Sequence, residues 1–189
     1  MLCKTSESGD SPIFIQNLNN VKQRVVRKQH VSKMCFVCGE MNDSGLHARF
    51  YETETNELVA LINPSEKHQG YPGRMHGGIA ATILDETIAR CISIGKDEQL
   101  WGVTLEFKTR FRKPVPLGHE IKVVGRITME GTRSFEGTGE VLLPNGDIAV
   151  SAEGKYMKMS PERIVNDQFV DDEWYINENP DDPSEIEIP

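Results

Sequence analysis

Apolar and polar residues alternate along several segments of this chain, a pattern typical of β-strands with one buried face. Residues 46–51 alternate, and the apolar run 58–63 follows the polar stretch ETETNE, so the two segments predict a hairpin. Turn signals, including Asn145-Gly146, separate the later segments. Four further alternating segments, each expected to form a strand, span residues 103–111, 121–129, 134–143 and 148–157.

Residues 77–93 differ from these segments because they are apolar on nearly every side of a helix. Such a helix is expected to be buried on most of its surface, and Gly95 is a natural stop for it. Gly137 and Gly139 suggest that another backbone approaches the third of the four strands closely. The sequence therefore predicts an α+β domain in which an antiparallel sheet wraps around one long central helix.

The composition favours one globular domain. The chain has 189 residues, of which 38% are hydrophobic, and its formal net charge is −8. No apolar run approaches the roughly 20 residues that cross a bilayer, and the first ten residues lack the basic and apolar segments of a secretory signal. Four cysteines without such a signal indicate a reducing compartment, so we expect a cytoplasmic protein. The acidic balance argues against nucleic acid as the main partner.

The two ends differ in charge from the expected domain, which spans residues 35–160. Residues 1–34 form a basic extension in which Phe14, Leu18, Val21 and Val25 recur at helical spacing. This predicts a basic amphipathic helix that contacts nucleic acid or membrane, or that docks on the domain with a solvated basic face. We favour docking because no aromatic residues interleave the charges. Residues 161–189 form an acidic tail that we expect to be flexible.

The stretch HQGYPGRMHGGIAATILDE, residues 68–86, joins a glycine-rich loop to the start of the expected helix. A helix N-terminus presents unpaired N–H groups, and Gly77 and Gly78 carry no side chain that would block a substrate carbonyl. This arrangement can hold an oxyanion. The same pattern also fits a plain turn that leads into a core helix.

Two adjacent acids interrupt the apolar helix, and helical spacing separates their roles. Glu86 has Arg90 four residues later, a spacing that favours an ion pair. No basic residue lies within one turn of Asp85, so its carboxylate would be costly on a buried helix unless it is partnered or used. We therefore assign Asp85 to chemistry and Glu86 to structure; an Asp85 that only caps a loop is the alternative.

Cys35 and Cys38 form a Cys-x-x-Cys-Gly pattern that suits zinc binding or redox chemistry. A single pair supplies half of a zinc site, and His30 and His47 are weak candidates for the other ligands. We expect reduced structural thiols and no metal.

At this point the chain resembles a known family. HGGIAATILDE, with HQGYPG before it and VTLEFKTRFRKPVPLG after it, is similar to the hot-dog-fold acyl-CoA thioesterases. The His-Gly-Gly opening and the Asp nine residues after the His resemble the phenylacetyl-CoA thioesterase-like (PaaI-like) branch, and CFVCGEMNDSGLHARF resembles the start of one of its subgroups. The resemblance covers about residues 35–160.

The resemblance implies a hydrolytic site that needs no cofactor and no metal. Its oxyanion donor would be the N–H of Gly77, and its general base or nucleophile would be Asp85. Thr104, ten residues before Pro114, would help to place the water and would come from the partner subunit of a homodimer, or of a dimer of dimers. Basic residues expected to hold coenzyme A are Arg112, Lys113 and Arg133.

Some positions depart from the family pattern. An Asn that some members carry six residues before the His is Gly70 here, and Gln69 could serve in its place if the loop shifts by one residue. His76 is expected to brace the loop. Alternation also places Thr104 on the polar face of its strand, away from the apolar residues.

The implied reaction is hydrolysis of an acyl-CoA to a free acid and coenzyme A, without nucleic acid or membrane partners. A hot-dog hydratase is the alternative enzyme, but it needs a His beside the Asp, and none follows Asp85 before His119. A non-catalytic acyl-CoA-binding or sensing module is the alternative outside the enzymes. Asp85 distinguishes the two classes, because only an enzyme needs its carboxylate.

Overall fold

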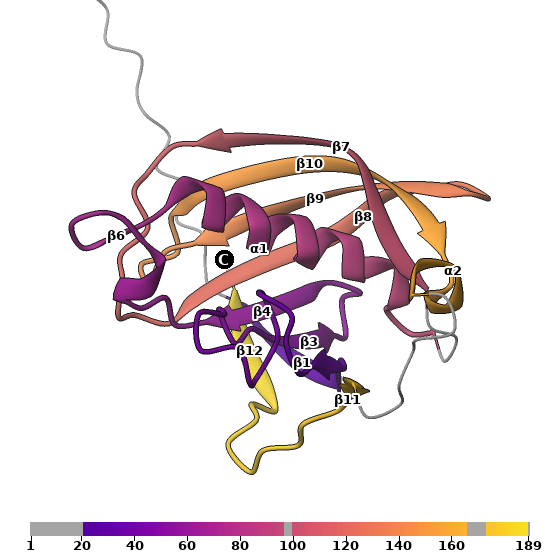
Figure 1. The fold of residues 1–189 in the computed structure, drawn as a ribbon, viewed down its shortest axis with the longest axis horizontal. Helices are drawn as coiled ribbons and strands as arrows, with labels where there is room; N and C mark the ends of the chain where they lie inside the picture. Colours follow the sequence, from indigo (N-terminus) through magenta and orange to yellow (C-terminus); the bar gives the residue numbers. More distant parts are fainter. Residues whose placement is uncertain (1–20, 97–99, 166–172, 189) are drawn as a thin grey trace, which may run out of the picture.

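The computed structural model describes residues 21–96, 100–165 and 173–188, in which one large antiparallel sheet curves around helix α1, Gly77–Arg90 (Figure 1). The eight strands of the sheet lie in the order β12-β1-β3-β4-β8-β9-β10-β7. Their bounds are β1 Val21–Lys28, β3 Arg49–Thr53, β4 Leu58–Ile62, β7 Trp101–Phe111, β8 Ile121–Glu130, β9 Ser134–Leu142, β10 Ile148–Met159 and β12 Glu185–Ile188. This is the α+β arrangement expected from the sequence.

Short elements complete the fold. Two small sheets pair β2 with β11 and β5 with β6, and a second helix, α2, follows β10. Their bounds are β2 Val31–Ser32, β5 Gln69–Tyr71, β6 Arg74–Met75, α2 Pro161–Val165 and β11 Trp174–Tyr175, with 3-10 turns η1 at Glu66–His68 and η2 at Cys91–Ser93. No helix among the described residues is both long enough and apolar enough to cross a membrane.

Glycines in the sheet let α1 lie close to it. A Cβ added to Gly102 would meet the backbone oxygen of Ala89 at 2.7 Å, and one added to Gly137 would meet Cγ2 of Ile88 at 2.6 Å. Gly139 is similar, with Ile88 at 3.0 Å. The close backbone approach expected at Gly137 and Gly139 is found at β8, where an added Cβ would lie 2.8 Å from the carbonyl oxygens of Arg126 and Val124, respectively, and α1 adds the Ile88 side chain.

A bulge in β7 changes which face its side chains occupy. β10 pairs Lys155 with Glu106 but Tyr156 with Thr104, so Leu105 is an extra residue. One extra residue reverses the alternation, because strand side chains have a period of two. Thr104 therefore faces α1, on the same side as Phe107 and Phe111. The placement of Thr104 on a polar face away from the apolar residues is wrong.

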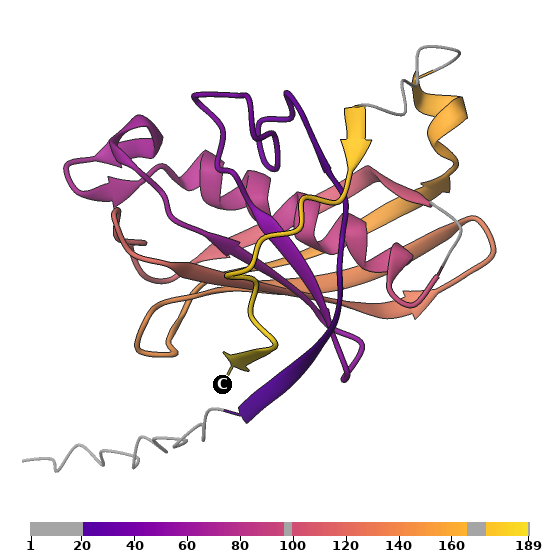
Figure 2. The same cartoon turned by 90° about the horizontal axis from the view of Figure 1, so that it is seen from below.

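One segment from each chain end, β1 and β12, belongs to the large sheet rather than to a separate extension. Residues 21–28 form strand β1, so the basic helix is wrong there, and residues 1–20 lie outside the described part. β1 pairs with β12 from the acidic tail, as Figure 2 shows. The flexible tail is thus wrong for Glu185–Ile188, where the acidic strand neutralises a basic one: Lys22 and Glu185 form an ion pair of 3.5 Å.

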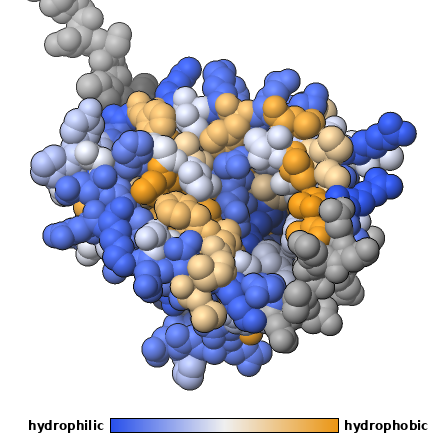
Figure 3. All heavy atoms as spheres, viewed as in Figure 1, coloured by the Kyte–Doolittle hydropathy of each residue, from blue (hydrophilic) through white to orange (hydrophobic). Residues whose placement is uncertain are grey.

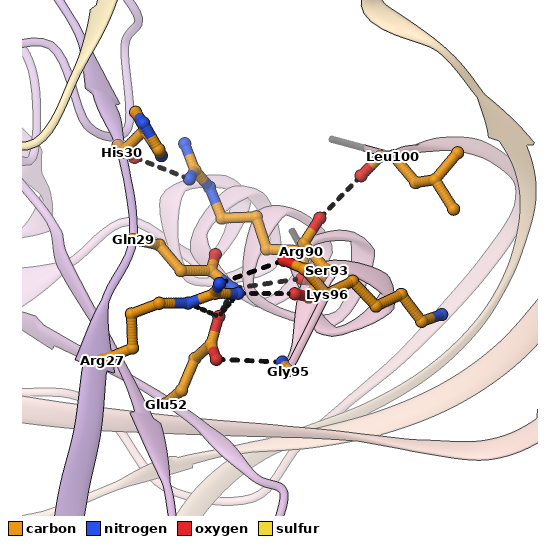
Figure 4. Close-up of polar contacts among 9 residues, drawn as sticks. All are labelled: Arg27, Gln29, His30, Glu52, Arg90, Ser93, Gly95, Lys96 and Leu100. Atoms are coloured by element: carbon orange, nitrogen blue, oxygen red, sulfur yellow. Dashed lines mark hydrogen bonds and ion pairs between the residues drawn. The ribbon is translucent and has the colours of Figure 1, made fainter. Parts of the chain in front are cut away.

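A buried carboxylate joins β1 and β3 to the end of α1 (Figure 4). Glu52 is only 2% exposed, and it accepts hydrogen bonds from Arg27 (2.7 Å), Gln29 (2.9 Å) and the N–H of Gly95 (3.1 Å). Arg27 also donates to the Ser93 carbonyl at 2.8 Å. Because buried charges are tolerated only when partnered, this network fixes the position of the helix end.

We predict that Gly102→Ala destabilises the protein by about 1–3 kcal/mol, because the new methyl group forces the backbone of α1 away from β7. Urea unfolding of both variants and of the wild type measures the change. Gly131→Ala is the matched control, since its Cβ would meet nothing nearer than a carbonyl at 3.3 Å. Equal unfolding midpoints for the two variants would contradict the close contact.

Candidate active site

Asp85 lies on α1 where the helix crosses β7 and β10. The Thr104 hydroxyl donates to Asp85 Oδ1 at 2.9 Å, and the Tyr156 hydroxyl donates to the same oxygen at 3.2 Å. Burial raises the pKa of Asp85 above that of an ordinary aspartate, and the two hydroxyl donors offset part of this rise. The carboxylate is therefore oriented by two donors, and within the described part of the chain it has no basic partner, as the helical spacing predicted.

Tyr156 is a site residue that the sequence analysis did not identify. Its ring is fully buried and stacks on Phe135 with 5.1 Å between ring centroids. The alternation of β10 alone gave no reason to separate it from the other core residues. The only available signal was its hydroxyl group, because a buried tyrosine usually needs a hydrogen-bond partner.

Glu86 and Arg90 form the ion pair that their spacing predicted. Arg90 Nη2 lies 2.8 Å from Glu86 Oε1, and Arg90 also donates to the His30 carbonyl at 2.9 Å. The guanidinium lies over the rings of Phe50 and Trp174. Glu86 is thus neutralised by a buried cation, which leaves Asp85 as the carboxylate available for chemistry.

The first turn of α1 carries the other expected groups. His76 is the N-cap residue of the helix, and its Nδ1 accepts a hydrogen bond from the Gly78 N–H at 2.9 Å. Among the described residues, the Gly77 N–H has no hydrogen-bond partner. A side chain at Gly70 would meet the backbone of His76 at 2.9 Å, which explains why no Asn fits there. Gln69 accepts from the Gly73 N–H at 2.8 Å and also lies at this end.

Gly77 and Asp85 are not brought together within one chain. They are eight residues apart on one helix, which corresponds to about 12 Å along its axis. Phe111 packs against Gly77, while Thr104 contacts Asp85, so the two groups face opposite parts of β7. Thr104 reaches Asp85 from the same chain, so the expectation that a partner subunit supplies this contact is wrong.

The basic residues expected to hold coenzyme A do not form one cluster. Arg112 donates to Ser151 at 2.6 Å and Lys113 lies 2.5 Å from Asp147, both just after the end of β7 near Gly77. Arg133 lies in the β8–β9 turn, where its carbonyl accepts from the Lys158 N–H. Lys158 pairs with Gly102, which places Arg133 near the start of β7. Arg112 follows the end of the same strand, so the two arginines are separated by nearly the length of β7, about 30 Å.

A cavity of about 760 Å³ lies next to Thr104 and Glu86, between the second half of α1, the first residues of β7 and the segment around Trp174. Residues on its wall include Cys35, Glu86, Arg90, Thr104, Trp101 and Trp174. The Trp174 indole N–H is buried without a hydrogen-bond partner among the described residues. Figure 3 shows hydrophobic side chains on both sides of a hollow on the face that carries α1.

The cysteine pair lies next to this site, but its donors do not fit a zinc centre. The ligand atoms of Cys35, Cys38 and Glu86 lie within 4.8 Å of one another, and neither His30 nor His47 belongs to the group. Arg90 Nη2 is 3.2 Å from Cys38 Sγ, so a permanent cation occupies the position next to the sulfur. A structural zinc ion takes four ligands, whereas the described residues offer three and an opposing charge.

Comparison with known proteins agrees with this architecture. Residues 72–149 match the model of the thioesterase superfamily. The acyl-coenzyme A thioesterase THEM4 of Mus musculus is 29% identical over 119 residues, which are 62% of this chain and 50% of that protein. The chain thus spans about half the length of this curated relative.

Solved structures share the fold. A crystal structure of a thioesterase superfamily protein superimposes with a TM-score of 0.61 and 24% identity, covering 67% of this chain and 61% of the other. The PaaI protein of E. coli, from the phenylacetic acid degradation operon, gives a TM-score of 0.54 with 14% identity, covering 61% and 81% of the two chains. The sheet wrapped around α1 is therefore a hot-dog fold, and residues 72–149 within it match the thioesterase superfamily.

Proposed function

We propose that this protein is an acyl-CoA thioesterase that hydrolyses the thioester bond to a free carboxylic acid and coenzyme A. The observation that carries the proposal is Asp85, a carboxylate that has no basic partner among the described residues and that the hydroxyl groups of Thr104 and Tyr156 hold in place. Thr104 also lies on the wall of the cavity. The superfamily match and the name of the mouse relative support the reaction and the acyl-CoA substrate.

We further propose that the working unit is a homodimer joined along β7. This strand is the last of the sheet and is 11 residues long, so its outer edge offers a row of unpaired backbone groups. Leu105 and Phe111 are about half exposed on it, at 49% and 54%. Antiparallel pairing of two β7 edges would satisfy the backbone groups and cover both side chains.

This pairing would also complete the reaction centre. Along β7, Asp85 lies opposite Thr104 and Gly77 lies opposite Phe111. The midpoint of these two positions on the strand falls between Phe107 and Lys108. A two-fold axis near Phe107 would bring Gly77 of the partner subunit towards Asp85. The same axis would bring Arg133 of the partner subunit towards the end of the sheet that carries Arg112 and Lys113, where we propose that coenzyme A binds.

The chemistry follows from these positions. The thioester oxygen would accept a hydrogen bond from the partner's Gly77 N–H, which stabilises the oxyanion by about 3 kcal/mol. Asp85 would take a proton from the attacking water, or would itself attack and form an anhydride that water then cleaves. In both routes the C–S bond breaks and the coenzyme A thiolate leaves. Thr104 and Tyr156 would hold the carboxylate in the ionised, correctly oriented form.

Residues near Gly77 have supporting positions in this scheme. His76 and Gln69 would fix the loop that presents the N–H, and Gly78 would leave room for the substrate carbonyl. Association of two such dimers into a tetramer and the cytoplasmic location stay predictions.

We predict that a panel of short, medium, long and aromatic acyl-CoAs includes substrates, and that Asp85→Asn lowers kcat/KM by about 100-fold or more, because the base or nucleophile is lost. Loss of thioester absorbance measures the rate. Asp43→Asn makes the same chemical change at an exposed loop position and is the control. No turnover by the wild type, with saturable binding in wild type and Asp85→Asn alike, would instead support the acyl-CoA sensor.

We also predict a shifted pH profile. Asp85 acts as the ionised form and its pKa is raised, so activity should fall on acidification at a higher pH than an ordinary aspartate allows. The hydrogen bond from Thr104 lowers this pKa, so Thr104→Val should move the acid limb of kcat/KM to still higher pH.

The control for this profile is Thr132→Val, which makes the same change in an exposed turn. An acid limb that stays in place in Thr104→Val, or moves to lower pH, would show that the contact between Thr104 and Asp85 does not govern the ionisation.

A further inference from the structure

Cys35 and Cys38 form a pair of thiols that the hydrolytic scheme does not use. They lie on the turn after β2, where the Gly39 N–H donates to the Cys35 carbonyl at 2.8 Å and holds the two side chains on one side. Both sulfur atoms lie within a group that spans no more than 4.8 Å. This spacing places the two sulfur atoms near each other, so a disulfide needs them to approach to a bond length of about 2 Å.

The two thiols differ in access. Cys38 is 1% exposed, whereas Cys35 is partly exposed and lies on the wall of the 760 Å³ cavity. A small molecule that enters the cavity can therefore reach Cys35 without contacting Cys38. One accessible and one buried sulfur in a Cys-x-x-Cys turn is the arrangement that separates an attacking thiol from a resolving thiol.

The surroundings favour a thiolate at Cys35. The Val37 N–H points at Cys35 Sγ from 3.3 Å, which stabilises a negative charge on that sulfur. A hydrogen bond from the Cys38 thiol is the main cause that lowers the pKa of Cys35, and it outweighs burial and the nearby Glu86 carboxylate. The same hydrogen bond, with burial, raises the pKa of Cys38.

We propose that Cys35 and Cys38 are a redox-active dithiol that exchanges with small organic disulfides entering the cavity, with Cys35 as the attacking and Cys38 as the resolving thiol. The Cys35 thiolate attacks one sulfur of the disulfide and releases the first thiolate. Cys38 loses its proton and attacks Cys35 Sγ, which releases the second thiolate and closes the Cys35–Cys38 bond. The protein gives two electrons and the external disulfide is reduced to two thiols.

Glutathione disulfide is the probe, and intact-protein mass spectrometry under native conditions is the readout. In a Cys3→Ser background, which removes the one cysteine outside the described residues, we expect the protein to lose two hydrogen atoms without keeping an adduct. Cys38→Ser should trap a glutathione adduct at residue 35, whereas Cys35→Ser should gain no adduct at residue 38. Cys91→Ser, in which another buried thiol is removed, should behave as the wild type does.

Alkylation of the wild type provides a second measurement that does not depend on any variant folding. Iodoacetamide followed by peptide mapping should modify Cys35 about tenfold faster than Cys38 and Cys91, because among these three thiols of the described residues Cys35 alone combines access with thiolate character. Equal adducts in Cys35→Ser and Cys38→Ser, or no adduct at residue 35 in Cys38→Ser, would overturn the proposal. The proposal would also be overturned, in favour of a metal site, if the purified wild type contained stoichiometric zinc and both Cys35→Ser and Cys38→Ser lost it.

Discussion

The close contact between α1 and the concave face of the sheet determines where every group of the candidate site lies. Three glycines, Gly102, Gly137 and Gly139, remove the side chains that would otherwise hold the helix away. The helix therefore lies near enough for hydroxyl groups on β7 and β10 to reach Asp85. The same contact removes water from one side of the carboxylate, which raises its pKa. The position of Asp85 and its raised pKa therefore both follow from the close contact between α1 and the sheet.

Arg90 separates the roles of the two neighbouring acids. Its guanidinium is buried and pairs with Glu86, so that charge is neutralised inside the protein. Asp85, on the next position of the helix, points to a different side and receives only neutral donors. Arg90 also contacts the sulfur of Cys38. The same guanidinium therefore forms the ion pair with Glu86 and lies against the thiol pair. The candidate active site and the thiol pair therefore share one structural support.

Much of this fold was predictable because its strands alternate and its helix is apolar on most sides. Asp85 was predictable for a related reason, since helical spacing showed that it lacks a basic neighbour. Thr104 was assigned to the wrong face because the extra residue at Leu105 reverses the alternation, and a bulge leaves no simple mark in sequence. The helix expected around Val21 and Val25 failed because tertiary pairing with β3 and β12 overrides a local apolar pattern. Tyr156 was missed because its partner is distant in sequence.

The central claim is that one reaction centre combines Asp85 of one subunit with the Gly77 N–H of the other. A heterodimer of Asp85→Asn and Gly77→Pro, purified through two different affinity tags, tests it most directly. Proline at the first helical position removes the N–H with little strain, and Gly77→Ala is the control that keeps the N–H. Both homodimers should be nearly inactive, whereas the heterodimer keeps one intact site of two and should show about half of the wild-type acyl-CoA hydrolysis. A heterodimer as inactive as its parents, or a wild type that is active as a monomer, would contradict the shared site.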